Sequence, residues 1–68
     1  MKFYFEGKLV RTSKTHDYNW AILRINADGT LKVYGCRADR GSAEAEAARM
    51  KKISDCYADV QVVPLEKK

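Results

Sequence analysis

The chain opens with a strand-like alternation of apolar and polar positions. Phe3, Phe5 and Leu9 lie on one side of this pattern, and most of the residues between them are charged or carry a polar tip. A period of two is typical of a strand with one buried face. Gly7 interrupts the pattern, which indicates either a bulge or a tight turn that divides it into two short strands.

Two further strands are predicted on either side of a turn. Residues 11–17 are polar without an apolar period and predict a loop, after which residues 18–25 alternate as a second strand. The segment 26–29 (Asn-Ala-Asp-Gly) is the strongest local signal in the chain, because Gly29 tolerates the positive φ that a hairpin turn needs. Residues 31–38 then return as a third strand.

A helix and a last strand follow. Gly41 and Ser42 predict the start of the helix, because a Ser hydroxyl can accept hydrogen bonds from the free amides of a helix N-terminus. Apolar side chains then recur at helical spacing and predict a buried stripe. The stripe consists of Ala43, Ala47, Met50, Ile53 or Ser54, and Tyr57. Residues 60–65 form the last strand, and Pro64 indicates that this strand ends there or lies at an edge.

These elements predict a single α+β domain over residues 1–68, with a three- to four-stranded antiparallel sheet and the order β-β-β-α-β. One helix covers only one face of such a sheet. We expect it to cover the face that carries Phe3, Phe5, Leu23, Ile25, Leu31 and Val33. The opposite face would then carry Tyr4, Tyr18, Trp20, Ile22 and Tyr34. A shift of one residue in strand parity would exchange the two faces and bury the rings under the helix.

The aromatic face with its basic rim is the predicted binding surface. Tyr and Trp combine a large contact area with a polar tip, and exposed apolar faces of this size tend to associate. The predicted partner-binding residues are Tyr4, Tyr18, Trp20, Tyr34, Arg11, Lys14, Arg37 and Arg40. The alternative is that the N-terminal segment or the C-terminal tail folds over this face and buries it.

Charge narrows the class of partner. The formal net charge is +4, and all of the excess lies in residues 1–40, which hold eight basic and four acidic residues. Such an excess attracts an anionic partner, although it also keeps a small domain soluble. Rings with a basic rim fit a protein partner or a second copy of the chain. They also fit single-stranded RNA, whose bases stack on exposed rings, but no Gly-x-x-Gly loop or similar RNA-binding signature is present.

The start of the predicted helix carries a second, weaker signal. Arg37, Arg40, Gly41 and Ser42 converge where a strand runs into the helix N-terminus. Exposed amides and two guanidinium groups there can hold a phosphate or a carboxylate. A Gly-Ser pair at this position is also simply a good helix cap, which is the favoured interpretation.

Candidate catalytic and metal-binding residues are few. His16 adjoins Asp17, but no Ser or Cys stands at a defined nucleophile position, so we expect no enzymatic activity, no cofactor and no small-molecule substrate. Cys36, Cys56 and the one His are too few ligands for structural zinc. We expect two reduced thiols; a bridge between Cys36 and Cys56 is geometrically possible but is not the favoured interpretation. No apolar run approaches the length of a membrane span, so a cytoplasmic location is expected.

A resemblance adds to these inferences. The segment 7–14 (Gly-Lys-Leu-Val-Arg-Thr-Ser-Lys), Tyr18 and the segment 34–36 (Tyr-Gly-Cys) resemble small accessory proteins encoded in bacteriophage genomes, over about half of the chain. The resemblance implies a stand-alone protein without enzymatic activity. That group includes anti-CRISPR-like inhibitors that cover the surface of a host defence complex. Many of them are acidic mimics of nucleic acid, whereas this chain is basic, and no functional residue carries over.

Overall fold

The computed structural model describes residues 1–68 and contains six strands, one α-helix and one short 3₁₀ helix. In chain order these are β1 (Lys2–Phe5), β2 (Lys8–Thr12), β3 (Trp20–Ile25), β4 (Leu31–Arg37), α1 (Arg40–Ile53), η1 (Asp55–Tyr57), β5 (Gln61–Pro64) and β6 (Glu66–Lys67). Two antiparallel sheets result, sheet A with the order β2-β1-β6 and sheet B with the order β4-β3-β5. The α+β class, the antiparallel pairing and the single helix on a sheet confirm the prediction from sequence.

The N-terminal segment is a hairpin of two strands. Glu6 and Gly7 both have positive φ, 50° and 79°, and they connect β1 to β2 directly. Positive φ at both central residues defines a type I′ turn, whose twist matches that of the flanking strands. Of the two interpretations of Gly7, the tight turn is therefore confirmed. The structure therefore has two strands more than the predicted order β-β-β-α-β. One comes from the division of the N-terminal segment into β1 and β2, and the other is β6, which follows β5.

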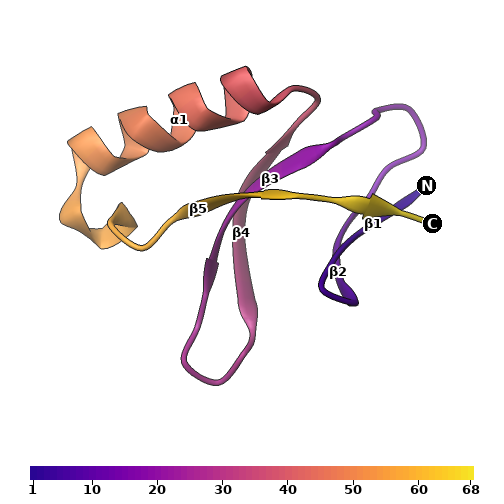
Figure 1. The fold of residues 1–68 in the computed structure, drawn as a ribbon, viewed down its shortest axis with the longest axis horizontal. Helices are drawn as coiled ribbons and strands as arrows, with labels where there is room; N and C mark the ends of the chain where they lie inside the picture. Colours follow the sequence, from indigo (N-terminus) through magenta and orange to yellow (C-terminus); the bar gives the residue numbers. More distant parts are fainter.

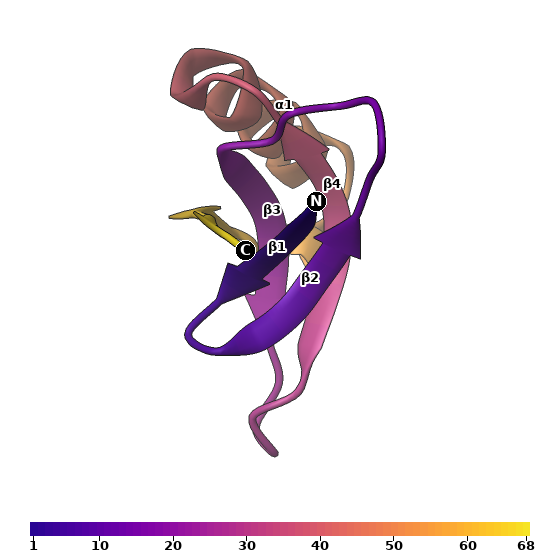
Figure 2. The ribbon, with the colours of Figure 1, turned by 90° about the vertical axis from the view of Figure 1, so that its right-hand side faces the viewer.

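The C-terminal segment joins the two sheets. β5 pairs with β3, the Leu65 amide then donates to the Asn19 carbonyl at 2.9 Å, and β6 pairs with β1. Sheet A lies against one face of sheet B, and α1 lies against the other (Figures 1 and 2). Sheet B is thus the middle layer, covered on both sides. No helix of the structure is long and apolar enough to cross a membrane.

The predicted parity of sheet B is wrong. On the side of α1, the fully buried Ile22 packs with Ala43, Ala47 and Val60, and Trp20 and Tyr34 are half-buried against them. Leu23, Leu31 and Val33, which the sequence predicts under the helix, instead face sheet A and pack in one core with Phe5 of β1. Ala43 and Ala47 are small, so α1 lies close to the sheet and the large rings of Trp20 and Tyr34 fill the space around it.

A bulge in β4 explains how its side chains are distributed. Ile22 lies opposite Gly35, whereas Leu23 lies opposite Val33, so β4 holds one extra residue between the two pairs. Val33 and Cys36 are three positions apart and would point to opposite faces of a regular strand. The extra residue brings both into the core that faces sheet A.

The start of α1 also differs from the prediction. The N-cap is Asp39, whose carboxylate accepts a hydrogen bond from the Ser42 amide at 2.9 Å, so the helix begins earlier than Gly41-Ser42 suggested. Asp is as good an N-cap as Ser, and it lies where β4 has just ended. Of the predicted stripe, Ala43 and Ala47 are buried, while Ile53, the last helical residue, is 71% exposed.

Gly7 in the β1–β2 turn and Gly41 in the first turn of α1 should respond in opposite ways to substitution by alanine. Gly7→Ala meets no atom within 4 Å, but it forces an L-residue to φ +79°, which should lower the free energy of unfolding by about 1 kcal/mol. Gly41→Ala lies in the first turn of α1 and should raise it by about 0.5 kcal/mol. Urea unfolding of the two variants measures both changes. An increase in the free energy of unfolding on Gly7→Ala would contradict the turn assignment, and a decrease on Gly41→Ala would contradict the gain expected in the helix.

Candidate functional site

Four of the eight predicted binding residues, Tyr18, Trp20, Arg37 and Arg40, lie where β3 begins and β4 passes into α1, and a fifth, Arg11 of β2, joins them through the Tyr18 ring. The Arg40 guanidinium lies 5.5 Å from the centroid of the Trp20 ring, and Trp20 is paired with Arg37 across the two strands. The Arg11 guanidinium lies 5.5 Å from the centroid of the Tyr18 ring. We call this group of residues (Arg11, Tyr18, Trp20, Arg37 and Arg40) the arginine end.

Asn19 explains why the arginine end wraps around sheet B. Its amide donates to the Arg37 carbonyl in β4, while its carbonyl accepts from Leu65 beyond β5. In a regular strand both groups of one residue point to the same neighbour, so Asn19 breaks the alternation. Tyr18 therefore packs on the side of sheet A, and Trp20 packs on the side of α1. The Asn19 side chain also donates to the Ala38 carbonyl at 2.7 Å and holds the chain leading into α1.

Positive charge at the arginine end is only partly neutralised. Arg40 makes an exposed ion pair with Glu44 at 3.0 Å, but Arg11 and Arg37 make none. Arg37 donates to the Cys36 carbonyl at 2.7 Å, which orients its guanidinium without cancelling its charge. A cation over an aromatic ring likewise keeps its charge. The arginine end therefore offers guanidinium groups that are oriented and partly unpaired.

The remaining predicted residues lie elsewhere. Tyr4 lies in sheet A with the Lys68 ammonium 5.3 Å from its ring centroid. Tyr34 lies beside α1, with the Lys32 ammonium 5.8 Å from its ring centroid and the Tyr57 ring in an edge-to-face contact, the two centroids being 5.3 Å apart. Lys14 is exposed in the loop between β2 and β3. The eight residues thus do not form one open face, and each of the four rings has a cation of the same chain over it.

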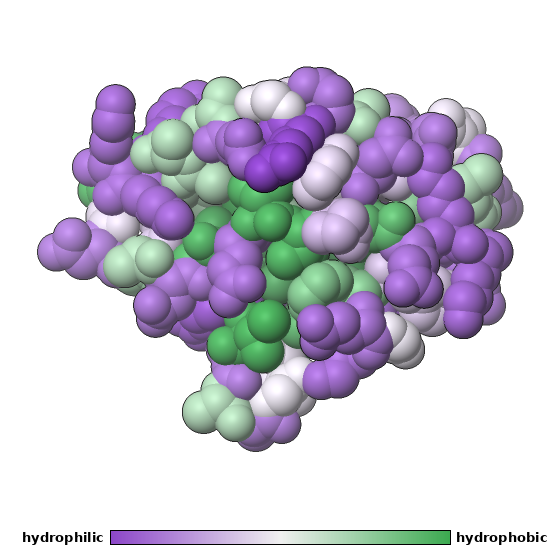
Figure 3. All heavy atoms as spheres, viewed as in Figure 1, coloured by the Kyte–Doolittle hydropathy of each residue, from purple (hydrophilic) through white to green (hydrophobic).

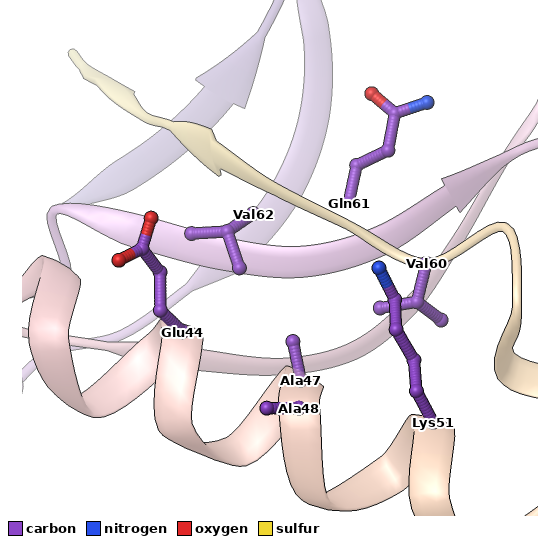
Figure 4. A pocket seen from close by; sticks show the side chains of 7 residues that line it. All are labelled: Glu44, Ala47, Ala48, Lys51, Val60, Gln61 and Val62. Atoms are coloured by element: carbon purple, nitrogen blue, oxygen red, sulfur yellow. The ribbon is translucent and has the colours of Figure 1, made fainter.

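One groove was not predicted from sequence. It has a volume of about 440 Å³ and lies between α1 and β5, as Figure 4 shows. Its apolar floor is formed by Ala47, Ala48, Val60 and Val62, and Glu44 and Lys51 stand at its two ends. On the face of the molecule that carries β5, apolar residues gather across the middle and hydrophilic residues surround them (Figure 3). The signal in the sequence was the helical spacing of Glu44, Ala48 and Lys51 along one edge of α1.

The two thiols differ in exposure. Cys36 is only 3% exposed, and burial raises the pKa of its thiol despite the charges of Arg11 and Arg37 nearby. Cys56 is exposed and accepts a hydrogen bond from the Ser54 hydroxyl at 3.1 Å. The neutral thiol of Cys36 is a poor nucleophile, because the thiolate is the reactive form.

His16 lies next to the arginine end without forming a catalytic pair with a carboxylate. Its Nδ1 is 3.0 Å from the Thr15 hydroxyl, and its ring stacks on Tyr18 with the centroids 5.8 Å apart. Asp17, its neighbour in sequence, pairs with Lys67 instead. No three His, Cys, Asp or Glu side chains lie close enough together to hold a metal ion.

Comparison with known proteins finds no matching family model, no matching curated protein and no matching solved structure. The resemblance to bacteriophage accessory proteins therefore stays a prediction from sequence.

The thiols should be distinguishable by their reactivity. At pH 8, a disulfide reagent such as dithionitrobenzoate should modify Cys56 at the rate of a free thiol. It should modify Cys36 at least roughly a hundredfold more slowly, because reaction at a buried thiol requires local opening. The time course of absorbance separates the two phases, and Cys56→Ser removes the fast one. Equal rates for both thiols would contradict the burial of Cys36.

The raised pKa of Cys36 also predicts the direction of a pH effect. The folded state favours the protonated thiol, so its contribution is complete below the ordinary thiol pKa. It is lost as the pH rises through that value, because the unfolded state then loses its proton first. The free energy of unfolding should therefore fall more steeply between pH 8 and 10 than it does in Cys36→Ala. Identical slopes would show that Cys36 does not contribute.

Proposed function

We propose that this protein is a non-enzymatic binding module that holds an acidic segment of a partner protein at the arginine end. One observation carries the proposal. The guanidinium groups of Arg11 and Arg40 are held over the rings of Tyr18 and Trp20, while Arg11 and Arg37 have no carboxylate of their own chain to pair with.

Such an arrangement suits carboxylate recognition. Guanidinium presents a planar fork of donors that binds a carboxylate through two hydrogen bonds. Rings beneath Arg11 and Arg40 restrict these side chains before a ligand arrives, so less conformational entropy is lost on binding. The net charge of +4 adds a long-range attraction toward an acidic surface.

A protein partner is favoured over single-stranded nucleic acid by the state of the rings. Base stacking needs an open ring face. Tyr18 and Trp20 each have a guanidinium over one face and are half-buried against the cores of sheet B, and Tyr34 is packed by Lys32 and Tyr57. A base would have to displace these groups. Phosphate remains the competing ligand, since guanidinium binds it as well as carboxylate.

The proposed function includes no chemical step, because the arginine end offers no reactive nucleophile. Its nearest thiol, Cys36, is buried with a raised pKa and so stays protonated. Covering a partner's surface, as the resemblance to bacteriophage inhibitors implies, requires only such a contact.

The proposal is tested by titrating the protein into a fluorescently labelled acidic peptide of twelve residues, rich in Asp and Glu, and measuring anisotropy. Arg11→Gln with Arg37→Gln should weaken binding about tenfold or more, since each hydrogen-bonded charge pair contributes about 1.5–3 kcal/mol. The matched control is Lys2→Gln with Lys52→Gln. This control also removes two positive charges, but at exposed positions outside the arginine end, and it should change the affinity less than threefold.

Two outcomes overturn the proposal. An equal loss of affinity in both double variants would mean that the peptide is attracted by net charge alone. Tighter binding to a single-stranded RNA of twelve nucleotides than to the peptide, with a steep dependence on salt, would identify the arginine end as a nucleic-acid site.

A further inference from the structure

β5 is a free edge of sheet B, and its last residue, Pro64, is the one that lies opposite a residue of the arginine end, Trp20. Sheet B has the order β4-β3-β5, so one side of β5 pairs with β3 and the other has no strand beside it. Its sequence, Gln-Val-Val-Pro, carries no charge. An unpaired edge of this kind is a template for a further strand.

The hydrogen-bond pattern shows what this edge offers. The Leu65 amide donates toward the β3 side, to the Asn19 carbonyl. Pairs in an antiparallel ladder alternate between bonded and non-bonded. Val63, two residues before Leu65, therefore also turns its amide and carbonyl toward β3, and Val62 and Pro64 turn theirs outward. Because proline has no N–H, Val62 is the residue that presents both a donor and an acceptor at the edge.

The opposite edge of sheet B is better protected. β4 is bulged at Tyr34 and carries the charged side chains of Lys32 and Arg37. Bulges and charges are features that prevent strands from adding to an edge. On β5 only Pro64 serves this purpose. A strand is therefore expected to add at β5 rather than at β4.

Charges on α1 indicate what would cover the β5 edge. Glu44 and Lys51 stand at opposite ends of the groove with Ala48 between them, and they are about 10 Å apart along the helix. The edge therefore carries a carboxylate at one end, small apolar residues in the middle and an ammonium group at the other. The carboxylate of Glu44 also pairs with Arg40 of its own chain, one turn away on the exposed side of α1. A copy of this edge turned by 180° presents Lys51 to Glu44 and Glu44 to Lys51. Such self-complementarity is what a two-fold interface requires.

We propose that two copies of this chain associate through β5 and the adjacent edge of α1, across a two-fold axis that passes beside Val62. Each Val62 amide donates to the Val62 carbonyl of the second copy, and sheet B becomes one six-stranded sheet with both helices on the same face. Glu44 of each copy pairs with Lys51 of the other, and the two Ala48 residues allow the helices to approach.

The small core gives a reason for this association. Only 10 of the 68 residues are buried, so the single chain removes little apolar surface from water. Chains of this size commonly gain stability by pairing. The groove floor of Ala47, Ala48, Val60 and Val62 is apolar surface that a second copy would cover.

The test measures the mass of the full chain in solution by sedimentation equilibrium. The wild type should reach twice the 7.8 kDa chain mass at micromolar to millimolar concentration. Glu44→Lys and Lys51→Glu should each raise the dissociation constant about tenfold or more, because each places two like-charged pairs across the axis. An equimolar mixture of these two variants should restore the dimer as a heterodimer, and the double variant Glu44→Lys with Lys51→Glu should dimerise by itself.

Val62→Pro provides an independent check on the strand pairing. It removes the outward amide at an edge position where proline is tolerated, and it also replaces a half-buried side chain that packs against the core under α1. Circular dichroism should show a folded protein, and sedimentation should show a monomer. A wild type that stays monomeric at millimolar concentration overturns the proposal. So does a dimer that keeps its affinity in both single charge variants, or a mixture of them that stays monomeric.

Dimerisation can be separated from peptide binding by variants of Arg11 and Arg37, whereas Glu44→Lys also removes the ion-pair partner of Arg40. Arg11→Gln with Arg37→Gln should leave the dimer mass unchanged, since neither residue lines the groove.

Discussion

Burial of β3 on both faces is the constraint on which the rest of the structure depends. Ala21, Ile22 and Leu23 are consecutive and have no exposed surface, so β3 needs a layer above it and a layer below it. α1 supplies one layer, and the hairpin of β1 and β2 with β6 supplies the other. Every other element is placed by this requirement: β4 and β5 flank β3, and the C-terminal segment crosses from one sheet to the other.

The same constraint explains the state of the aromatic side chains. A sheet covered on both faces leaves no room for an open platform of rings, so Trp20 and Tyr34 become part of the core under α1. Their outer surfaces are then covered by cations of the same chain, Arg40 and Lys32. Rings that looked like a binding surface therefore act as supports, and the guanidinium groups that they orient become the groups available to a partner.

The two surfaces that we propose for association differ in chemistry. The arginine end offers oriented cations to an acidic segment, whereas the β5 edge offers an unpaired strand and a charge pattern that complements itself. Glu44 connects the two, because it pairs with Arg40 and also lines the groove. A small domain with one middle layer has few other places to bind, since its core leaves no deep cavity.

Local chemistry in the sequence was enough to determine the class and most of the elements: the turn at residues 26–29, the alternating strands and the alanine stripe of α1 depend on neighbours in the chain. Only the tertiary structure decided which face of sheet B the helix covers. Three consecutive buried residues in β3 have no single polar face, and the bulge at Tyr34 shifts the parity of β4 midway, so alternation alone could not assign the sides. The arginine end and the groove depend on the same decision, because Arg11 meets Tyr18, Arg40 meets Trp20 and α1 meets β5 only after the layers have packed.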